Sequence, residues 1–425
     1  MSKQHLKSSN IANQRPLSPY RITVAVPELG YGGAKKYSIV LANMLFELGA
    51  DVTLLVFSRG DEELSQATKC PVKIIDICND KSRLLRFYRR YRAYRLAKKE
   101  SHIFISNLTG PNLLNALTYG SAAAIIVEHG SRIYDPNLTR RTKVFHQFFL
   151  DPMKFYFAKQ IVSVSHGLTV EIANLAWGNV DKKMIVMYPP LDIDRKASDI
   201  SKPEKIEFQK NLKKIRYICF VGRLSPEKGV LELLQIYKIL SRTSPNIKLV
   251  IVGDGPIWDE AISLTQTLKI ELNNFHENVP SIIFCGAVED PKPILSHSEG
   301  LLVPSEVEAF GYVIIEGIEA GVPVFAADVP WGAREALTLG EEWRKEATAR
   351  VEPQVTDFGF LLPRPHTRSA QKMWADAVVK SLTEKPRLIE SAKLAISRQD
   401  RLSDFSVEHA KQKWASLILS LDRPF

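Results

Sequence analysis

The chain has 425 residues, 45% of them hydrophobic and 24% charged, a composition that excludes disordered and fibrous proteins and a length that suits two or three domains. It lacks an apolar run of the ~18 residues that a transmembrane helix needs, and residues 1–20 are polar without the apolar core of a secretory signal, so we expect a disordered leader and a cytoplasmic protein. The formal net charge of +10 lies in the first half, where residues 1–200 hold 28 Lys and Arg against 17 Asp and Glu, which indicates an anionic partner such as a membrane surface, a phosphorylated lipid or nucleic acid.

The first half of the chain alternates short apolar strands with longer helical patterns. After the first strand, Ile39, Leu41 and Leu45 fit one face of a helix that Gly49 can end. Because the strands are continuously apolar, this alternation predicts a buried parallel sheet with helices on its faces. The expected strands cover residues 21–27, 51–58, 72–77, 102–107, 122–129 and 160–165.

Glycines and histidines follow several of these strands. Gly30, Gly32 and Gly33 precede the first helix and would let a diphosphate or a sugar approach the backbone, although the Gly-Lys-Ser/Thr ending of a Walker A motif is missing. His129 and His166 end two later strands, where a histidine can meet a substrate hydroxyl. The alternative for both histidines is a structural side chain with satisfied hydrogen bonds.

Residues 81–100 form a basic helical pattern with nine Lys and Arg and one acid. Residues 139–160 form a second stretch rich in basic and aromatic side chains. A basic amphipathic helix with aromatics suits an anionic membrane surface, but a surface helix whose apolar stripe faces the core has the same pattern. Nucleic-acid binding is the third alternative, and no recognition motif accompanies the charge. The apolar stripe of the first stretch comprises Leu84, Phe87, Tyr88, Tyr91 and Tyr94.

A proline-rich, charged stretch at residues 188–208 reads as a linker, after which the strand–helix alternation restarts. The tail from Met373 to Leu421 has a helical pattern. The second half is therefore expected to be another doubly wound domain. Such domains bind ligands at the carboxyl ends of their strands, and two that face each other create a cleft. The expected strands of this half cover residues 215–222, 247–255, 281–287, 300–305 and 322–328.

The stretch PSEVEAFGYVIIEG directly follows one of these strands and leads into a helix. The first free N–H groups of the helix would lie at residues 311–313, and a helix N-terminus preceded by glycine attracts phosphate. Glu308 would lie just before this end and Glu316 about one turn inside it. Because carboxylates bind paired hydroxyls, two of them beside a phosphate suit a diphosphate between two sugars, hence a sugar nucleotide. The alternative is a solvated acidic helix start.

The stretch FVGRLSPEKGV follows the first strand of the second half. Its two cations, Arg223 and Lys228, can neutralise a diphosphate, and arginine can do so with two parallel hydrogen bonds. Scattered charges on a surface loop are the alternative. The occurrence of both this loop and the glutamate-containing stretch in one domain favours a diphosphate site.

The four cysteines show no metal-like spacing and no disulfide framework. Cys219 and Cys285 lie in apolar strands, where buried reduced thiols are expected. Cys70 and Cys78 are too irregularly placed for a zinc site. We therefore expect no bound metal.

These motifs together resemble the retaining glycosyltransferases of the GT-B fold, family four (glycosyl transferases group 1), which includes many bacterial polysaccharide and lipopolysaccharide enzymes. The resemblance runs from about Arg21 to Leu421. PSEVEAFGYVIIEGIEAGVPV resembles the family's motif of two glutamates separated by seven residues, VGRLSPEKGVLELL its diphosphate loop and GGAKKYSIVLANML its first-domain glycine loop. IVGDGP and DFGFLLP also fall at the expected places. Two departures are Pro189 in the inter-domain turn and Ala333, while Glu335 matches.

The resemblance implies a fold class and a site. The fold would be α/β, with two Rossmann-like parallel-sheet domains facing across a cleft: an acceptor-binding domain at 21–195 and a nucleotide-sugar-binding domain at 206–402, with the helix at 405–421 packing back on the first. Residues 336–359 would be a specificity insertion. Glu308, at the donor sugar, and His129, near the reacting sugar, would be catalytic. The donor-binding residues would be Arg223 and Lys228 at the diphosphate, Phe310, Gly311 and Tyr312 at the distal phosphate, Glu316 at the ribose, and Gly33 closing the cleft.

The activity implied is transfer of a hexose from a nucleoside-diphosphate sugar to a glycan or lipid-linked acceptor with retention of configuration, in cell-surface polysaccharide biosynthesis. UDP-sugar is the favoured co-substrate, no cofactor or metal is expected, and no enzymic nucleophile is assigned. The protein is expected in the cytoplasm, with a peripheral location on the inner face of the plasma membrane through residues 81–100 as the further hypothesis, and nucleic acid is not an expected partner. The alternatives are a nucleotide-sugar epimerase and a non-catalytic sugar-nucleotide-binding paralogue.

Overall fold

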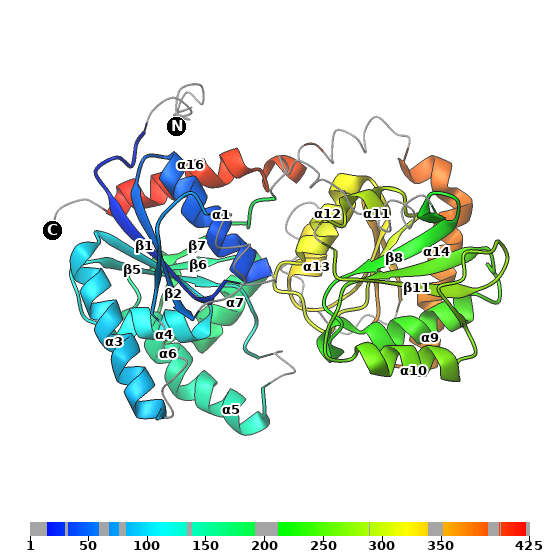
Figure 1. The fold of residues 1–425 in the computed structure, drawn as a ribbon, viewed down its shortest axis with the longest axis horizontal. Coiled ribbons are helices and arrows are strands. Elements are labelled where there is room, and N and C mark those ends of the chain that lie inside the picture. Colours follow the sequence, from blue (N-terminus) through cyan, green and yellow to red (C-terminus); the bar gives the residue numbers. More distant parts are fainter. Residues whose placement is uncertain are drawn as a thin grey trace. The chain divides into compact units, whose positions relative to one another are not determined.

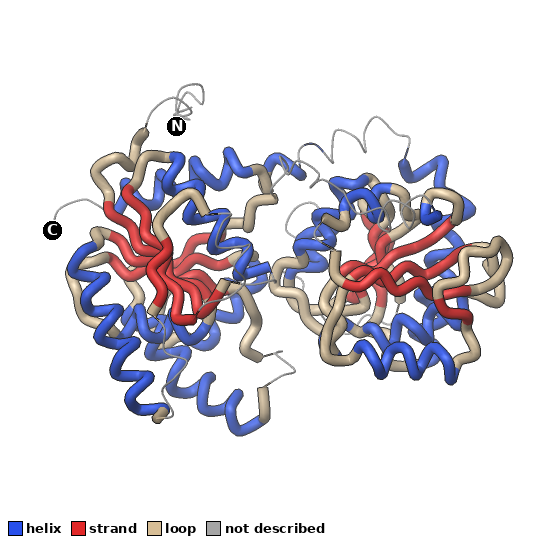
Figure 2. Tube along the Cα trace, viewed as in Figure 1, coloured by secondary structure: helices blue, strands red, loops and turns tan. Residues whose placement is uncertain are grey.

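The computed structural model describes residues 15–29, 33–58, 68–75, 82–133, 138–191, 211–288, 290–338, 352–389, 399 and 401–421. The chain forms two compact units, drawn in Figures 1 and 2, each with strands in the middle and helices on both sides. The first unit comprises residues 1–133, 140–193 and 404–425, and the second comprises 134–139 and 194–403. Most of the expected leader and linker, and residues 339–351 of the expected insertion, lie outside the described residues.

The first unit is built on a parallel sheet in the order β3-β2-β1-β4-β5-β6-β7. The chain leaves β1 for β2 on one side and later enters β4 on the other, so the strand order reverses at β1. The residues of its central strands β1, β4 and β5 are almost all buried and mostly apolar, as expected for a sheet covered on both faces. The strands are β1 (Arg21–Glu28), β2 (Asp51–Ser58), β3 (Val72–Ile74), β4 (Ile103–Asn107), β5 (Ala123–Glu128), β6 (Gln160–Ser163) and β7 (Met184–Val186).

Helices cover both faces of this sheet. On one face α1 contacts α16, so the C-terminal helix lies beside the first helix of the chain (Figure 1). On the other face neighbouring helices contact each other in the order α3, α4, α6, α7. The helices are α1 (Gly33–Glu47), α3 (Arg83–Glu100), α4 (Thr109–Leu117), α5 (Arg140–Phe145), the π-helix η1 (His146–Leu150), α6 (Asp151–Phe157), α7 (His166–Leu175), the 3-10 turn η2 (Asp181–Lys183) and α16 (Val407–Leu421).

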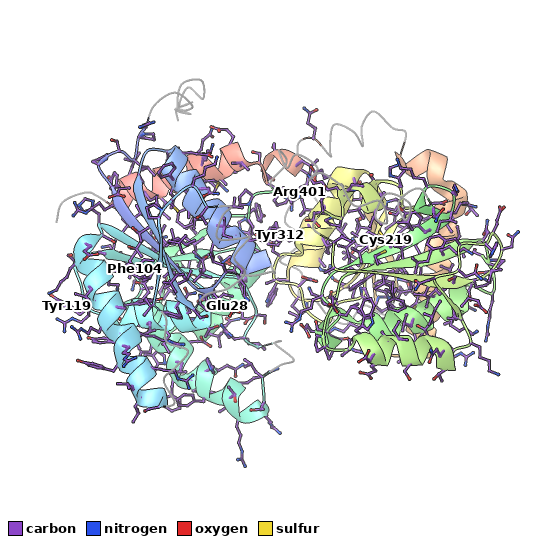
Figure 3. The ribbon with its side chains drawn as sticks, viewed as in Figure 1. Glu28, Phe104, Tyr119, Cys219, Tyr312 and Arg401 are labelled. Carbon is purple, nitrogen blue, oxygen red and sulfur yellow. The ribbon has the colours of Figure 1, made fainter. Side chains whose placement is uncertain are left out.

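The apolar stripe predicted for α3 is divided in the structure. Tyr94 is fully buried in the core beside Phe104, and Tyr91 packs against the same cluster. Leu84, Phe87 and Tyr88, at the N-terminal end of the helix, are 83%, 54% and 60% exposed. The interpretation in which the whole stripe faces the core is therefore wrong, because only Tyr91 and Tyr94 of the stripe pack against the core cluster. Figure 3 shows Phe104 in the interior of this unit and Tyr119, which follows α4, at its surface.

The second unit is built on an eight-stranded sheet in the order β10-β11-β9-β8-β12-β13-β15-β14. The strand order reverses at β8, which lies between β9 and β12. All described pairs are parallel except β14 with β15, an antiparallel edge that the sequence did not predict. The strands are β8 (Arg216–Val221), β9 (Ile247–Val252), β10 (Glu271–Leu272), β11 (Ser281–Gly286), β12 (Leu301–Val303), β13 (Val324–Ala327), β14 (Gln354–Thr356) and β15 (Gly359–Leu362).

Two helical layers cover this second sheet. On one face α9 contacts both α10 and α14, and on the other α12 contacts α11 and α13. Across the described residues of both units, no helix has the length and apolarity needed to span a bilayer. The helices are the 3-10 turn η3 (Pro226–Lys228), α9 (Val230–Leu240), α10 (Trp258–Thr267), α11 (Lys292–Ser296), α12 (Tyr312–Ala320), α13 (Gly332–Leu337) and α14 (Arg368–Ile389).

The three described cysteines have no disulfide partner. Cys70 and Cys219 are buried and Cys285 is half-buried. Burial raises the pKa of the Cys219 and Cys285 thiols to about 12, so both stay protonated and unreactive at neutral pH. Cys78 lies outside the described residues.

Candidate functional site

The reversal of strand order at β8 brings two loops of the second unit together. One loop follows β8 and contains the turn η3, and the other follows β12 and leads into α12. Because parallel neighbouring strands end at the same edge, both loops lie at the carboxyl edge of the sheet, where open α/β sheets bind ligands. A backbone hydrogen bond from the Glu306 N–H to the Glu227 carbonyl, 2.9 Å long, ties the loops directly.

A glycine sets how closely the two loops approach. Gly229 ends η3 with φ +67°, a left-handed conformation that other residues rarely adopt. A Cβ atom built on it would lie 2.2 Å from the Pro304 carbonyl oxygen. The backbone after β8 therefore packs directly on the backbone after β12, and no larger residue fits between them.

The close packing of the two loops brings together Lys228 and Glu308, two of the charged side chains predicted to bind the donor. The Lys228 ammonium donates to Glu308 Oε1 at 2.5 Å, although the residues are eighty positions apart. The Ser305 hydroxyl donates to the same oxygen at 2.8 Å. The Glu308 side chain is 10% exposed and that of Lys228 is 28% exposed, so solvent reaches the pair mainly from the side of the lysine.

The backbone of Glu308 is held between the starts of two helices. Its N–H donates to the Pro330 carbonyl, and its own carbonyl accepts from the N–H groups of Trp331 and Gly332 at 2.9 and 2.6 Å. Gly332 begins α13, and a Cβ there would meet the Phe310 carbonyl oxygen at 2.4 Å. These contacts fix the direction of the Glu308 side chain independently of its ion pair.

Helix α12 begins immediately after this loop without a side-chain cap. Its N-cap is Gly311, at φ +79°, where a Cβ would also press on Ile314 at 2.9 Å. A nine-residue helix that starts on a glycine presents the positive end of its dipole beside the Lys228–Glu308 pair. The Phe310 ring is buried and packs edge-on against Tyr312, with 5.1 Å between centroids, so it supports the turn.

The other charged residues predicted around the donor in the second unit are not part of this ion pair. Glu316 is half-buried, one turn inside α12, and Glu335 is buried in α13. Arg223 is exposed, and no described side chain forms an ion pair with it. The structure thus brings Lys228 and Glu308 into contact, whereas Arg223 extends from the same loop without a protein partner in the described part of the chain.

In the first unit, His129 lies at the carboxyl end of β5. Its Nε2 lies 2.9 Å from the Asn107 Oδ1, which comes from the neighbouring strand β4, and its ring packs edge-on against Tyr37 at 4.8 Å. Burial lowers the pKa of His129 to about 4, so the ring is neutral at pH 7. Because a carbonyl-type oxygen accepts from Nε2, the proton lies there and Nδ1 is left as an acceptor.

Asn107 and Tyr37 were missed by the sequence reasoning. Asn107 ends a predicted strand next to the one that ends in His129, and this position was the available signal. The residue after it, Leu108, has φ +70°, a strained conformation of the kind that clusters at functional sites. Gly33 is the first residue of α1, while Gly30 and Gly32 lie outside the described residues. His166 begins α7 and packs on Tyr188 instead.

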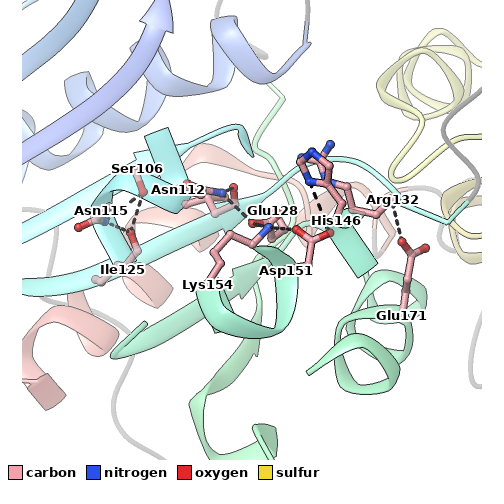
Figure 4. A network of polar contacts seen from close by, with 11 residues as sticks. Ser106, Asn112, Asn115, Ile125, Glu128, Arg132, His146, Asp151, Lys154 and Glu171 are labelled. Carbon is pink, nitrogen blue, oxygen red and sulfur yellow. Dashed lines mark hydrogen bonds and ion pairs between the residues drawn. The ribbon is translucent and has the colours of Figure 1, made fainter. Parts of the chain in front are cut away.

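A buried polar network lies behind β5 in the same unit (Figure 4). Lys154 pairs with both Glu128 and Asp151 at 2.8 Å, and all three side chains are nearly inaccessible to solvent. Despite its burial, Glu128 has a lowered pKa, because Lys154 and Arg132 stabilise its charge. The network holds α6 against the sheet. Over the described residues of both units, no group of three His, Cys, Asp or Glu could hold a metal ion.

Residues 201–352 match the family model described as Glycosyl transferases group 1. Among curated relatives, the capsular polysaccharide biosynthesis glycosyltransferase CapM of Staphylococcus aureus is 25% identical over 52% of this chain and 58% of its own length. Two uncharacterised glycosyltransferases of Methanocaldococcus jannaschii, MJ1059 and MJ1607, are matched over 64% and 45% of their lengths. The chain thus spans about half to two thirds of these relatives.

A longer match is to a Campylobacter jejuni enzyme named GalNAc-alpha-(1->4)-GalNAc-alpha-(1->3)-diNAcBac-PP-undecaprenol alpha-1,4-N-acetyl-D-galactosaminyltransferase, 22% identical over 94% of this chain and 98% of that protein. Among solved structures, Anabaena Alr3699/HepE in complex with UDP and glucose has a TM-score of 0.71 at 20% identity, covering 94% of this chain and 100% of that one. The glycosyltransferase WaaG has a TM-score of 0.62 at 16% identity, covering 93% and 99%. The predicted fold class, the GT-B fold with two parallel-sheet domains, is confirmed.

Proposed function

We propose that this chain is a retaining glycosyltransferase that moves a hexose from a nucleoside-diphosphate sugar to a glycan or lipid-linked acceptor. The observation that carries the proposal is the Lys228–Glu308 pair beside the uncapped start of α12, at the point where the strand order of the second unit reverses. It is supported by the family-model match to the same unit, and by relatives named for capsule and undecaprenol-linked glycan synthesis. UDP is the favoured nucleotide because structural neighbours were solved with UDP or UDP-glucose.

The opposite charges of Lys228 and Glu308 suit the two parts of a sugar diphosphate, namely the phosphates and the sugar hydroxyls. Lys228 and Ser305 both donate to Oε1 of Glu308, so within the described residues Oε2 has no donor and can accept from the hydroxyls of the donor sugar. The Lys228 ammonium has three donors, so it can bond a phosphate oxygen while it keeps Glu308. Arg223, exposed on the same loop, supplies a second cation for the diphosphate.

In the proposed reaction, the bond between the anomeric carbon and the diphosphate oxygen breaks, and its electron pair stays with the leaving group. The growing negative charge would be stabilised by Lys228, Arg223 and the positive end of α12, and of the two cations Lys228 is already held by Glu308. The acceptor oxygen bonds to the anomeric carbon on the face that the diphosphate leaves, and its proton passes to the departing phosphate. No side chain is assigned as a nucleophile.

His129 would bind a sugar hydroxyl in this scheme. Its ring is neutral and Nε2 is occupied by Asn107, so Nδ1 can accept the hydrogen bond of a hydroxyl without adding a positive charge. Asn107 acts as a positioning residue, because it sets the ring orientation and the tautomer.

The test is nucleoside diphosphate release by the purified full chain with a panel of nucleotide sugars, with and without glycan acceptors. We expect Lys228→Met to lower kcat by about 10²- to 10³-fold, as for removal of one donor to a developing oxyanion. Lys238→Met, on the half-buried side of α9, is the matched control and should leave kcat unchanged.

Other outcomes favour the alternatives. Formation of an epimeric nucleotide sugar in the absence of acceptor would indicate an epimerase. Tight nucleotide-sugar binding without turnover for any donor and acceptor would indicate a non-catalytic binding protein. Equal kcat values for the Lys228→Met and Lys238→Met variants would contradict the role given to the ion pair.

A further inference from the structure

The large apolar side chains that are exposed to solvent are distributed very unevenly. Within the described residues, all but one of them, Val355, belong to the first unit. Most lie on two helical segments, α3 and the continuous run of α5, η1 and α6. Soluble surfaces rarely gather so many exposed aromatic side chains without a binding partner.

The segment of α5, η1 and α6 exposes an aromatic face over residues 144–149. Val144, Phe145, Phe148 and Phe149 are 47%, 53%, 64% and 58% exposed, and their spacing places them on one side of the helix. The rings of Phe145 and Phe149 pack against each other at 5.7 Å between centroids, so they form one apolar surface. The π-helical turn η1, a feature frequent at functional sites, lies within this run.

The opposite side of this segment explains why the phenyl rings stay outside. Asp151 and Lys154 of α6 are buried and bond each other, and Lys154 also bonds Glu128 of β5 (Figure 4). This buried polar contact fixes which face of the helix meets the sheet. The phenylalanines therefore remain outside the core, because turning them inward would separate the buried charges of Lys154, Glu128 and Asp151.

The second segment adds positive charge to apolar surface. At the start of α3, Leu84, Phe87 and Tyr88 are exposed, and Arg92 and Arg95 are exposed one to two turns further on. Helix α4 lies between α3 and α6 and contacts both, so the two segments flank the same helix on one face of the sheet (Figure 1). Arg140 and Arg141 at the start of α5 are also exposed.

Both exposed segments lie toward the same edge of the sheet. A helix that leads into the next parallel strand runs against the strand direction, so its first residues lie at the carboxyl edge. The exposed residues are the first turns of α3, which precedes β4, and the region of α5 and η1, which precedes β6. This edge also carries His129 and Asn107, the residues proposed to meet a sugar.

We infer that these two segments form a docking surface for an anionic lipid bilayer, with the phenylalanines of residues 144–149 entering the interface and the arginines of α3 and α5 binding lipid phosphates. Phenylalanine and leucine on one side of a basic helix are the composition of interfacial helices. A second copy of the chain is a poorer occupant, because a two-fold contact would bring the same arginines face to face. Docking at the carboxyl edge would present lipid-linked acceptors to the first unit.

The test is sedimentation of the full chain with vesicles, which needs no turnover and is therefore independent of the proposed reaction. We expect binding to phosphatidylcholine vesicles that contain phosphatidylglycerol, weaker binding to phosphatidylcholine alone, and release by salt. Phe148→Ser/Phe149→Ser should abolish binding, and Arg92→Ser should weaken it by roughly fivefold, since one basic side chain near an anionic surface contributes about that factor. Trp177→Ser, at an equally exposed site outside both segments, is the control and should bind as the parent does.

Four results would overturn the inference. Equal binding to neutral and anionic vesicles would remove the role of charge, and unchanged binding of the Phe148/Phe149 double variant would remove the aromatic face. A parent chain that forms oligomers which the same double variant dissociates would identify the surface as a protein interface. Salt-dependent binding to nucleic acid that displaces vesicles would reassign it to that partner. Because the substituted side chains are exposed, melting temperatures should stay within a few degrees of the parent and confirm that the variants are folded.

Discussion

Replacing Gly229 by alanine tests whether backbone packing between two loops creates the proposed diphosphate site. At φ +67°, an alanine costs roughly 1–2 kcal/mol for its backbone conformation alone. Its Cβ would also lie 2.2 Å from the Pro304 carbonyl oxygen, well inside van der Waals contact, so one loop must move by about 1 Å. Overpacking of this kind adds about 1–3 kcal/mol, for a total of roughly 2–5 kcal/mol.

Gly286→Ala is the matched control. Gly286 belongs to the same unit and has φ +68°, but no heavy atom lies within 4 Å of the Cβ that it would gain. The Gly286→Ala variant should therefore lose only the part of the free energy of unfolding that comes from the backbone conformation, roughly 1–2 kcal/mol. The difference between the two variants isolates the steric contact, and at about 2–4 °C per kcal/mol for a unit of this size calorimetry will resolve it.

The catalytic readout separates packing from site geometry. Moving the loop after β8 shifts Lys228 away from Glu308, and an error of about 1 Å in positioning can cost on the order of 10²-fold in rate. We expect nucleoside diphosphate release to fall in Gly229→Ala and to be retained in Gly286→Ala. Equal losses of melting temperature in both variants, with unchanged release in Gly229→Ala, would refute the reasoning.

Two further predictions concern the first unit. Lys154→Met leaves Glu128 and Asp151 buried without their cation and should lower the free energy of unfolding by roughly 3–5 kcal/mol at neutral pH. Lys69→Met breaks an exposed ion pair and should cost no more than ~1 kcal/mol, so equal losses in melting temperature for the two variants would contradict this prediction. The pKa of His129 is lowered to about 4, so between about pH 6.5 and pH 4 only the unfolded chain takes up the proton. The contribution of His129 to the free energy of unfolding is therefore constant above about pH 6.5 and falls by up to ~1.4 kcal/mol per pH unit toward pH 4. His129→Gln should reduce the slope of melting temperature against pH in this range, and an unchanged slope would refute the prediction.

The sequence by itself was sufficient for the fold class, because its information is local. Continuous apolar runs identify buried parallel strands, and the glycine- and charge-containing stretches after them identify carboxyl edges. The apolar pattern did not predict short strands such as β7 and β14, because these strands bury too few apolar side chains to produce it. It also failed for α3, where the same basic-aromatic pattern is half core and half surface.

The contacts within the site were decided by tertiary structure. Lys228 meets Glu308 across eighty residues because β12 lies beside β8, and Asn107 meets His129 because β4 lies beside β5. No local pattern specifies which strands become neighbours, since all buried strands have similar apolar sequences. Strand order follows from the packing of the whole sheet, and the final fit depends on single backbone contacts such as that between Gly229 and Pro304. The residue types that a site needs can therefore be identified from the sequence, whereas the contacts between these residues are set only by the folded structure of each unit.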